Sequence, residues 1–421
     1  MNATRRRWPL LLLSLAIIGS GAGLAFHMMT QPVRIELTPT RTGQTEYCLT
    51  CHNGIELISA AHPLEEFGCT ACHGGVGEAL DEDQAHAGMV RNPAALDTAA
   101  QYCGECHAGQ ITLVERSLQA TYAGAITHVR RTFGQQATDV AEYAIALTGH
   151  LLAFAPTEDD PLPVQNFAAN CLSCHLRAEP IEADYYHRST GCSACHVLYG
   201  DDGRYQGGDP TISTEEAGHP TAHEFTTAIP YSQCNHCHNR GIYDMRTMQF
   251  LERDDMPPPD GMDDRQARLH DYYQPIGQFT LCEWELDCID CHTSQEVMGD
   301  ALLYDNRSQA QYTQCATCHG TLDSLPASAP ITSPTEIVMT RAALNPLVDL
   351  AVGDTVIVTE RDERMWHIRQ EGERWILTGK ATGTEYEVPL VTGTQCQQQP
   401  DDQASHYCHE CHAYDREAAL P

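Results

Sequence analysis

The stretch CLTCHNGIELISAAHPLEEFGCTACH, residues 48–73, contains two Cys-x-x-Cys-His pentads and, between them, a further histidine, His62. The pentad occurs nine times in the 421 residues. Its cysteines are Cys48, Cys51, Cys69, Cys72, Cys103, Cys106, Cys171, Cys174, Cys192, Cys195, Cys234, Cys237, Cys288, Cys291, Cys315, Cys318, Cys408 and Cys411. Each pair is followed directly by a histidine: His52, His73, His107, His175, His196, His238, His292, His319 and His412. The pentads use 18 of the 20 cysteines and leave only Cys282 and Cys396.

The histidine after every cysteine pair decides which chemistry the pentads indicate. Zinc sites built from Cys-x-x-Cys knuckles need no histidine at that position, and a disulfide framework has no use for it. Thioredoxin-like redox pairs occur singly, beside a βαβ pattern that this sequence lacks. The pentad is instead the attachment signature of c-type haem, in which two thiols one helical turn apart bond the porphyrin edge and the adjacent histidine binds the iron. The sequence therefore predicts nine covalently attached haems c.

Composition and charge agree with a chain that is organised by cofactors. Aromatic residues make up 7% of the sequence, and nine haems after the leader give one apolar porphyrin for roughly 44 residues. The net charge is −32. Such a surface repels nucleic acid and anionic lipid headgroups and favours basic partners or cationic acceptors. The simpler interpretation, which we favour, is that the charge keeps a cofactor-filled protein soluble.

The N-terminal residues 1–26 have the pattern of an export segment. Arg5, Arg6 and Arg7 precede the uncharged apolar run Trp8–Phe26. A cleavable signal peptide and an uncleaved membrane anchor both fit this pattern, and we favour the anchor slightly. In either case the arginines place the haem-bearing part outside the cytoplasm, at the outer face of the cytoplasmic membrane, in the periplasm or at the cell surface.

The pentad spacing predicts the organisation of the chain. Residues 45–200 form a haem domain with five pentads, residues 201–330 a haem domain with three, and residues 393–421 a C-terminal segment with the ninth. Residues 48–73 and 171–196 are similar enough to indicate an internal two-haem repeat, in which His62 corresponds to His187. Apolar periodicity favours helix over about 108–154. Alternating β-branched and polar residues predict a small antiparallel β insert at about 350–392, either a docking module or, as we favour, an inert insertion.

Histidines outside the pentads are candidates for the second axial position of each iron. Two strong axial ligands make an electron-transfer centre, whereas an open face makes a catalytic one. We set aside His27 in the leader, His236 and His409 within pentads, and His367 in the β insert. Nine candidates remain, which equals the number of irons: His62, His86, His128, His150, His187, His219, His223, His270 and His406. We expect six to eight of them to be ligands, with His62 and His187 the best placed and His406 the weakest; His219 and His223 compete for one role.

Other residues could close a haem face or cross-link the chain. Met245, Met248 and Met256 are candidate ligands, although methionine usually serves packing. Cys282 and Cys396 are expected to form a disulfide, as suits an exported chain. The alternatives are a thiolate ligand at Cys282 or two buried thiols.

The spacing of the pentads over residues 48–412 resembles that of the multihaem c-type cytochromes. The segments CNHCHNRG at 234–241, CIDCHTSQEVMGD at 288–300 and GKATGTEYEVPLV at 379–391 are similar to those of exported members that serve respiratory or extracellular electron transfer. The resemblance implies mainly short α-helices and loops around stacked haems, with little regular sheet. In such proteins a histidine often stands shortly before the CIDCH pentad. Here residues 280–284 are TLCEW and His270 is farther away, which leaves the distal ligand of that haem open.

The resemblance implies electron transfer through about nine mostly bis-histidine haems, between membrane respiratory donors and a periplasmic or extracellular acceptor. Its partners would be other cytochromes or a membrane quinol-oxidising complex, with no nucleic acid. We favour an electron carrier over two alternatives. One is a multihaem oxidoreductase with an open haem for nitrite, hydroxylamine or sulfur-oxyanion chemistry. The other is the subunit of a cytochrome oligomer or filament, in which neighbouring chains share histidines.

Overall fold

The computed structural model describes residues 33–178, 187–200, 202–238, 241–252 and 278–396, together with 408, 412 and 414–415. The leader and, among the candidate residues, His270, His406, Met256 and Cys411 lie outside the described residues. The chain divides into two compact units. The first comprises Met1–Ile55, His62–Val90 and Gly208–Ile212, and the second comprises Glu56–Ala61, Arg91–Gly207 and Ser213–Pro421.

Short turns rather than long elements build the first unit. Its helices are η1 (Cys48–Thr50), α2 (Leu64–Phe67), α3 (Thr70–His73) and α4 (Glu82–Ala85). Gly68 ends α2 with a φ of 63°, and a Cβ at this position would lie 2.7 Å from the Glu46 carboxylate. Only glycine fits both the left-handed backbone and the close approach.

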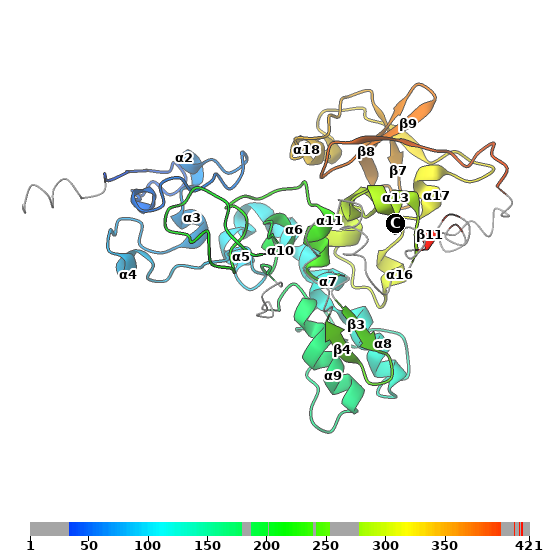
Figure 1. Cartoon of the computed structure of the whole chain (residues 1–421), viewed down its shortest axis with the longest axis horizontal. Helices are drawn as coiled ribbons and strands as arrows, with labels where there is room; N and C mark the ends of the chain where they lie inside the picture. Colours follow the sequence, from blue (N-terminus) through cyan, green and yellow to red (C-terminus); the bar gives the residue numbers. More distant parts are fainter. Residues whose placement is uncertain are drawn as a thin grey trace, which may run out of the picture. The chain divides into compact units, whose positions relative to one another are not determined.

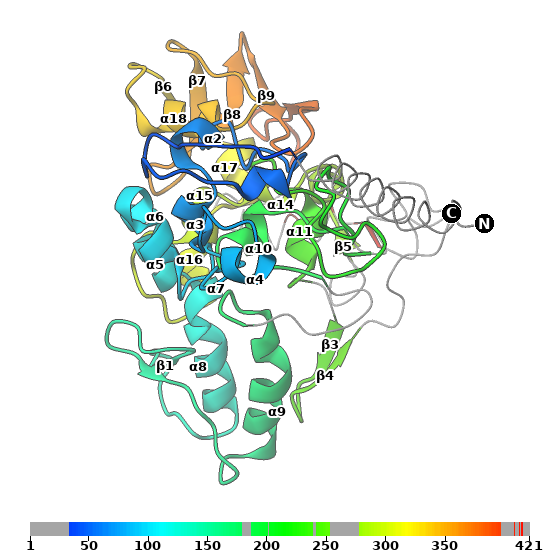
Figure 2. The same ribbon diagram turned by 90° about the vertical axis from the view of Figure 1, so that its left-hand side faces the viewer.

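A helical lobe occupies one part of the second unit. Its helices are α5 (Ala99–Tyr102), α6 (Gly104–Arg116), α7 (Leu118–Thr121), α8 (Ala123–Thr132) and α9 (Leu162–Asn170). The hairpin of β3 (Gly241–Asp244) and β4 (Gln249–Glu252) lies against α9. Helices α8 and α9 lie side by side (Figures 1 and 2). Their facing side chains, among them Ile126, Val164 and Phe167, form a buried core.

The helix expected over about 108–154 ends earlier than its periodicity suggests. Helix α8 stops at Thr132, and Gly134 follows with a φ of 76°. The chain then forms turns and two short parallel strands, β1 (Tyr143–Ala144) and β2 (Leu152–Ala153). Buried residues such as Leu151 and Phe154 pack into the core from these turns, so helical spacing here reflects burial without a helix.

Five further pentads of the second unit, among the residues that the structure describes, lie in or begin in single helical turns. These are η2 (Cys171–Cys174), α10 (Ser193–His196), α11 (Tyr231–Asn235), α14 (Cys288–Cys291) and α17 (Cys315–His319). Between and beside them lie α13 (Leu281–Glu285), α15 (Ser294–Met298) and α16 (Arg307–Ala310), and β5 (Gln278–Phe279) pairs with β11 (Tyr414–Asp415).

A five-stranded antiparallel sheet forms the β part of the second unit (Figure 1). Its strands are β6 (Ser328–Pro330), β7 (Thr355–Val358), β8 (Arg364–Glu371), β9 (Arg374–Thr378) and β10 (Glu385–Val388), in the order β10-β9-β8-β7-β6. Four strands fall within 350–392, where alternation predicts them. The fifth, β6, comes from before this segment, as does helix α18 (Ile337–Ala343), which contacts β8.

None of the helices in the described part of the chain has the length and apolar character that crossing a bilayer requires.

Candidate haem-attachment sites

The described pentads share one local backbone geometry. In six of them the backbone N–H of the histidine donates to the carbonyl of the first cysteine at 2.8–3.1 Å. In five of these the N–H of the second cysteine donates to the same carbonyl at 3.1–3.3 Å. The six histidines are His52, His73, His107, His196, His238 and His292. Both thiols therefore project from one turn of helix, which is the arrangement that attachment along one porphyrin edge requires.

None of the described cysteines forms a disulfide. The expected disulfide between Cys282 and Cys396 is therefore wrong. Cys282 lies instead in α13, with its Sγ 3.1 Å from Thr280 Oγ1, and it acts electrostatically on Cys291 and Cys318 of two pentads.

Burial keeps several of these thiols protonated. It raises the pKa of Cys171 and of Cys195 to about 11, and a neighbouring thiol in the same pentad adds to each shift. Burial also raises the pKa of Cys318 to about 12. The protonated thiol is the less nucleophilic form, so these cysteines are unreactive in the absence of a cofactor.

Thiols of different pentads approach one another. In the first unit Cys48 and Cys69 are hydrogen-bonded and, with a Glu46 oxygen, lie within 4.8 Å of each other. Glu46 is 1% exposed, and its carboxylate accepts the N–H of Cys69 at 2.7 Å, the N–H of Thr70 at 3.2 Å and the Thr70 hydroxyl. The carboxylate is thus occupied as a cap of α3, which leaves it poorly placed to bind a metal ion.

The six pentads of the second unit that the structure describes in full form a connected series. Side-chain hydrogen bonds join two pairs of pentads, through Cys234 with Cys288 and through Cys174 with Cys237. Three further pairs interact electrostatically: Cys103 with Cys192, Cys195 with Cys234, and Cys291 with Cys318. The pentad of Cys234 contacts three others and is therefore the branch point of the series.

Four pentad histidines have an Nδ1 partner of the kind that orients a metal ligand. Nδ1 lies 2.9 Å from the Val90 carbonyl in His73, 2.7 Å from the Thr226 carbonyl in His196 and 2.7 Å from the Pro389 carbonyl in His319. In His52 it lies 2.7 Å from Asp209 Oδ2, whose side chain is fully buried, and 3.0 Å from Thr211 Oγ1. An Nδ1–H held by an oxygen leaves the Nε2 lone pair for a metal, the usual second-shell pattern of metal-bound histidine.

Electrostatics also keep pentad histidines neutral. Burial lowers the pKa of His196 and of His238, and it lowers the pKa of His175 to about 4, with Arg188 and Arg177 adding to that shift. The neutral imidazole is the form that binds metals. His175 nevertheless differs from the four histidines above, because its Nδ1 accepts the backbone N–H of Arg177 at 3.0 Å.

The candidate distal histidines occupy varied environments. His86 is exposed, and its ring centroid lies 6.2 Å from that of His52, at an interplanar angle of 51°. His62 packs against Phe67, with ring centroids 5.2 Å apart. His128 and His150 are exposed.

The remaining described candidates lie in the second unit around residues 187–223. The His187 ring lies over Gly203, whose carbonyl accepts the N–H of His219. His223 Nδ1 lies 3.2 Å from the Glu56 carbonyl. His223 therefore shares the Nδ1 pattern of the pentad histidines, which distinguishes it from His219.

His236 and His367, which we excluded as candidate ligands from the sequence, have Nε2 in contact with a backbone carbonyl. His236 Nε2 lies 3.2 Å from the Tyr199 carbonyl, and His367 Nε2 lies 2.9 Å from the Asp290 carbonyl. His367 is 1% exposed. Nε2 of each is thus engaged by the backbone.

The β sheet holds the seventh and eighth pentads. Asp290 in the CIDC turn accepts the backbone N–H of Lys380 at 2.8 Å, and Lys380 Nζ donates to the Ile289 carbonyl. His319 binds the Pro389 carbonyl through Nδ1, and its own carbonyl accepts the N–H of Val391 at 2.9 Å. The segments 288–300 and 379–391, noted separately in the sequence, therefore meet.

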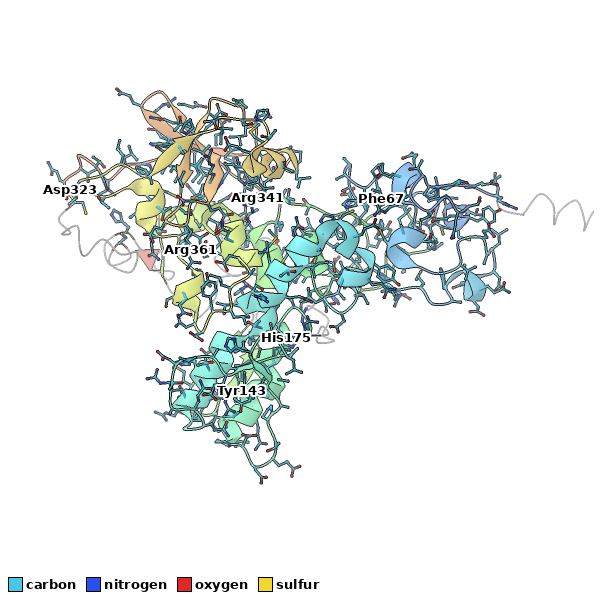
Figure 3. All side chains as sticks on the ribbon, turned by 180° about the vertical axis from the view of Figure 1, so that it is seen from behind. Phe67, Tyr143, His175, Asp323, Arg341 and Arg361 are labelled. Carbon is cyan, nitrogen blue, oxygen red and sulfur yellow. The ribbon has the colours of Figure 1, made fainter. Side chains whose placement is uncertain are left out.

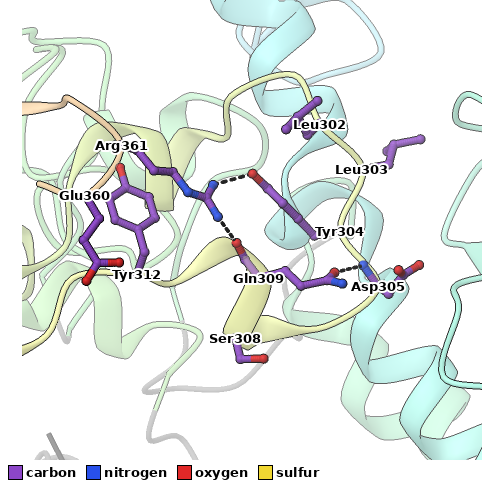
Figure 4. A pocket seen from close by; sticks show the side chains of 9 residues that line it. All are labelled: Leu302, Leu303, Tyr304, Asp305, Ser308, Gln309, Tyr312, Glu360 and Arg361. Carbon is purple, nitrogen blue, oxygen red and sulfur yellow. Dashed lines mark hydrogen bonds between the residues drawn. The ribbon is translucent and has the colours of Figure 1, made fainter. Parts of the chain in front are cut away.

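A pocket of about 580 Å³ lies near the seventh pentad (Figure 4). Arg361 crosses it and donates to Asp300, to the Tyr304 hydroxyl and to the Gln309 carbonyl. Two residues beyond Gln309, Gln311 Nε2 lies 3.2 Å from Nδ1 of His292. Because these acceptors already engage the guanidinium, the pocket does not present a free cation to an anionic ligand.

Sequence reasoning missed the oxygen groups that hold the pentads, chiefly Glu46, Asp209 and Asp290. Of these three residues, only Asp290 could have been singled out from the sequence, because it lies at an x position within the CIDCH pentad. The comparisons with protein-family models, curated proteins and solved structures found no match to this chain.

Proposed function

We propose that this chain is an exported multihaem c-type cytochrome. It would transfer electrons through about nine covalently bound haems, mostly bis-histidine ligated, between a membrane respiratory donor and a periplasmic or extracellular acceptor. The observation that carries the proposal is the connected series of pentads, since a series of closely spaced redox centres is what electron transfer along a protein requires.

The residues of the pentads fit the cofactor. The described cysteines form no disulfide and, in the regular pentads, lie on a single helical turn. Four of the adjacent histidines have Nδ1 against an oxygen, which is the contact that orients Nε2 of a metal-bound histidine. Bound haem would supply one-electron iron chemistry, while the chain fixes the spacing, the orientation of each imidazole and the surrounding charge.

The pair of His52 and His86 supports bis-histidine ligation. With metal–nitrogen bonds of about 2 Å and ring centroids about 1 Å behind each nitrogen, two imidazoles on opposite faces of one iron have centroids roughly 6 Å apart. The observed separation is 6.2 Å. We therefore assign His86 as the distal ligand of the haem held by Cys48 and Cys51.

Haem stoichiometry tests the proposal. Pyridine haemochrome absorbance combined with the mass of the purified protein should give nine haems per chain. A Cys315→Ser/Cys318→Ser variant should lose one haem, because both attachment thiols of the eighth pentad are removed. The control Cys396→Ser lies outside the pentads and should lose none. A wild-type chain without covalent haem would overturn the proposal.

A further inference from the structure

A buried cation, Arg188, lies against the fourth pentad. Arg188 is 3% exposed. Its Nη1 donates to the Ser189 carbonyl at 2.9 Å, and its Nη2 donates to the carbonyls of Ser173 and Ala178. Ser173 is an x position of the fourth pentad, so the guanidinium is bound directly to the backbone of a proposed attachment turn. A guanidinium stays protonated in proteins even when it is buried, so this side chain brings a fixed positive charge to the pentad.

The charge of Arg188 acts on three pentads. It acts electrostatically on His175 of the fourth pentad, on Cys195 of the fifth and on Cys237 of the sixth. The direction is that of a positive charge in each case, because Arg188 opposes protonation of the imidazole and favours ionisation of the two thiols. Three pentads from different stretches of the chain therefore experience the same buried cation.

These three pentads meet at the branch point of the series. A side-chain hydrogen bond joins Cys174 of the fourth pentad to Cys237 of the sixth, and Cys195 of the fifth interacts with Cys234 of the sixth. His175 lies where the lobe of α8 and α9 joins the rest of the second unit (Figure 3). Electrons that pass between the branches of the proposed series would therefore cross the part of the molecule on which Arg188 acts.

A fixed positive charge changes the reduction equilibrium of a nearby iron. The ferric state carries one more positive charge than the ferrous state, so a cation disfavours it and raises the midpoint potential. At roughly 10 Å and an effective dielectric constant of about 20, one unit charge changes a one-electron equilibrium about tenfold. For such a couple, a tenfold change corresponds to about 59 mV.

We infer that Arg188 raises the midpoint potentials of the haems held by the fourth, fifth and sixth pentads, and that it thereby favours reduction of the branch point. This inference rests on the haem attachment proposed above. Arg188 sets potentials and binds no iron. Arg177 provides a comparison, because it also acts on His175 but pairs with the carboxylates of Asp97 and Glu115 at a partly exposed site.

Spectroelectrochemical titration of the intact protein tests the inference. Arg188→Gln should shift three of the nine components downward, each by about tenfold in its reduction equilibrium. Arg188→Lys keeps the charge and should remain close to the wild type. The matched control Arg177→Gln should change the potentials much less, because two carboxylates and solvent already offset that charge. Adding Cys234→Ser/Cys237→Ser to Arg188→Gln removes the sixth haem and should leave two shifted components.

Haem stoichiometry on the same samples separates the two proposals. Unchanged or raised potentials in Arg188→Gln, with nine haems attached, would overturn the inference and leave the proposed function intact. Equal shifts in Arg188→Gln and Arg188→Lys would also overturn it, because they would reflect lost hydrogen bonds rather than lost charge. A chain without covalent haem would instead overturn the proposed function.

A second pair of variants leaves Arg188 in place and decides the matter if Arg188→Gln attaches fewer than nine haems. Ala178 is half-buried, and its carbonyl accepts from the guanidinium at 3.2 Å. Ala178→Asp places a carboxylate near Arg188 and should lower the potentials of haems at the branch point, whereas the neutral control Ala178→Asn should not. Equal potentials in these two variants would overturn the inference.

Discussion

Replacing Asp209 by asparagine removes a buried negative charge next to the proposed first haem. Asp209 Oδ2 lies 2.7 Å from Nδ1 of His52, and the carboxylate side chain is 0% exposed. Asparagine has the same shape, but its single oxygen can accept either the N–H of Thr211, which Asp209 accepts at 2.9 Å, or the Nδ1–H of His52. The substitution therefore removes the charge and at most one hydrogen bond, and loss of the bond to Nδ1–H would shift the potential in the same direction as loss of the charge.

The size of the effect follows from the geometry. An iron at Nε2 of His52 would lie about 6.5 Å from the carboxylate, so one unit charge at an effective dielectric constant of about 20 contributes about 2.5 kcal/mol. For a one-electron couple, where a tenfold change in equilibrium constant is about 59 mV, this corresponds to about 100 mV. The carboxylate stabilises the more positive ferric state. Asp209→Asn should therefore raise the midpoint potential of one haem.

Spectroelectrochemical titration of the intact protein measures this shift as the displacement of one component among nine. Thr211→Val is the matched control, because Thr211 Oγ1 lies 3.0 Å from the same Nδ1 but is neutral. The control should shift the potential much less. An unchanged or lowered potential in Asp209→Asn, with nine haems still attached, would refute the reasoning.

Three further predictions follow from contacts within the units. His86→Ala should leave one iron of nine high-spin by EPR quantitation; an all-low-spin spectrum, with the change appearing in His62→Ala instead, would contradict the assignment. Glu46→Ala leaves three donors without their acceptor and should lower the free energy of unfolding by about 3 kcal/mol in denaturant titrations, more than Glu46→Gln does; equal losses would argue against a charge-assisted cap. Lys380→Met leaves the Ile289 carbonyl without its donor and should lower unfolding stability by about 1–3 kcal/mol, whereas the exposed control Arg374→Met should change it little; equal effects would exclude a clamp by Lys380.

The two cysteines and the adjacent histidine of each site can be predicted from the sequence, because all three belong to one pentad. Cysteines at i and i+3 and histidine at i+4 define one helical turn wherever they occur. The oxygen partners do not follow, since tertiary packing brings them from elsewhere. Val90 lies 17 residues from His73, Pro389 lies 70 residues from His319, and no local pattern encodes these distances.

The distal histidines likewise cannot be predicted from the sequence alone. The internal repeat favours His62 through its correspondence with His187, yet His86 is the histidine whose ring lies near that of His52. Counting the histidines limits which residues are candidate ligands. The identity of the ligand at each iron depends on which loops pack together.

The contact between His52 and Asp209 spans 157 residues and therefore has a consequence for the order in which the protein is made. At roughly 5–20 residues per second, Asp209 emerges about 8–30 s after His52. During that interval the first pentad can form its turn but lacks its carboxylate. The first unit is thus completed late, although its histidines are among the earliest to be synthesised.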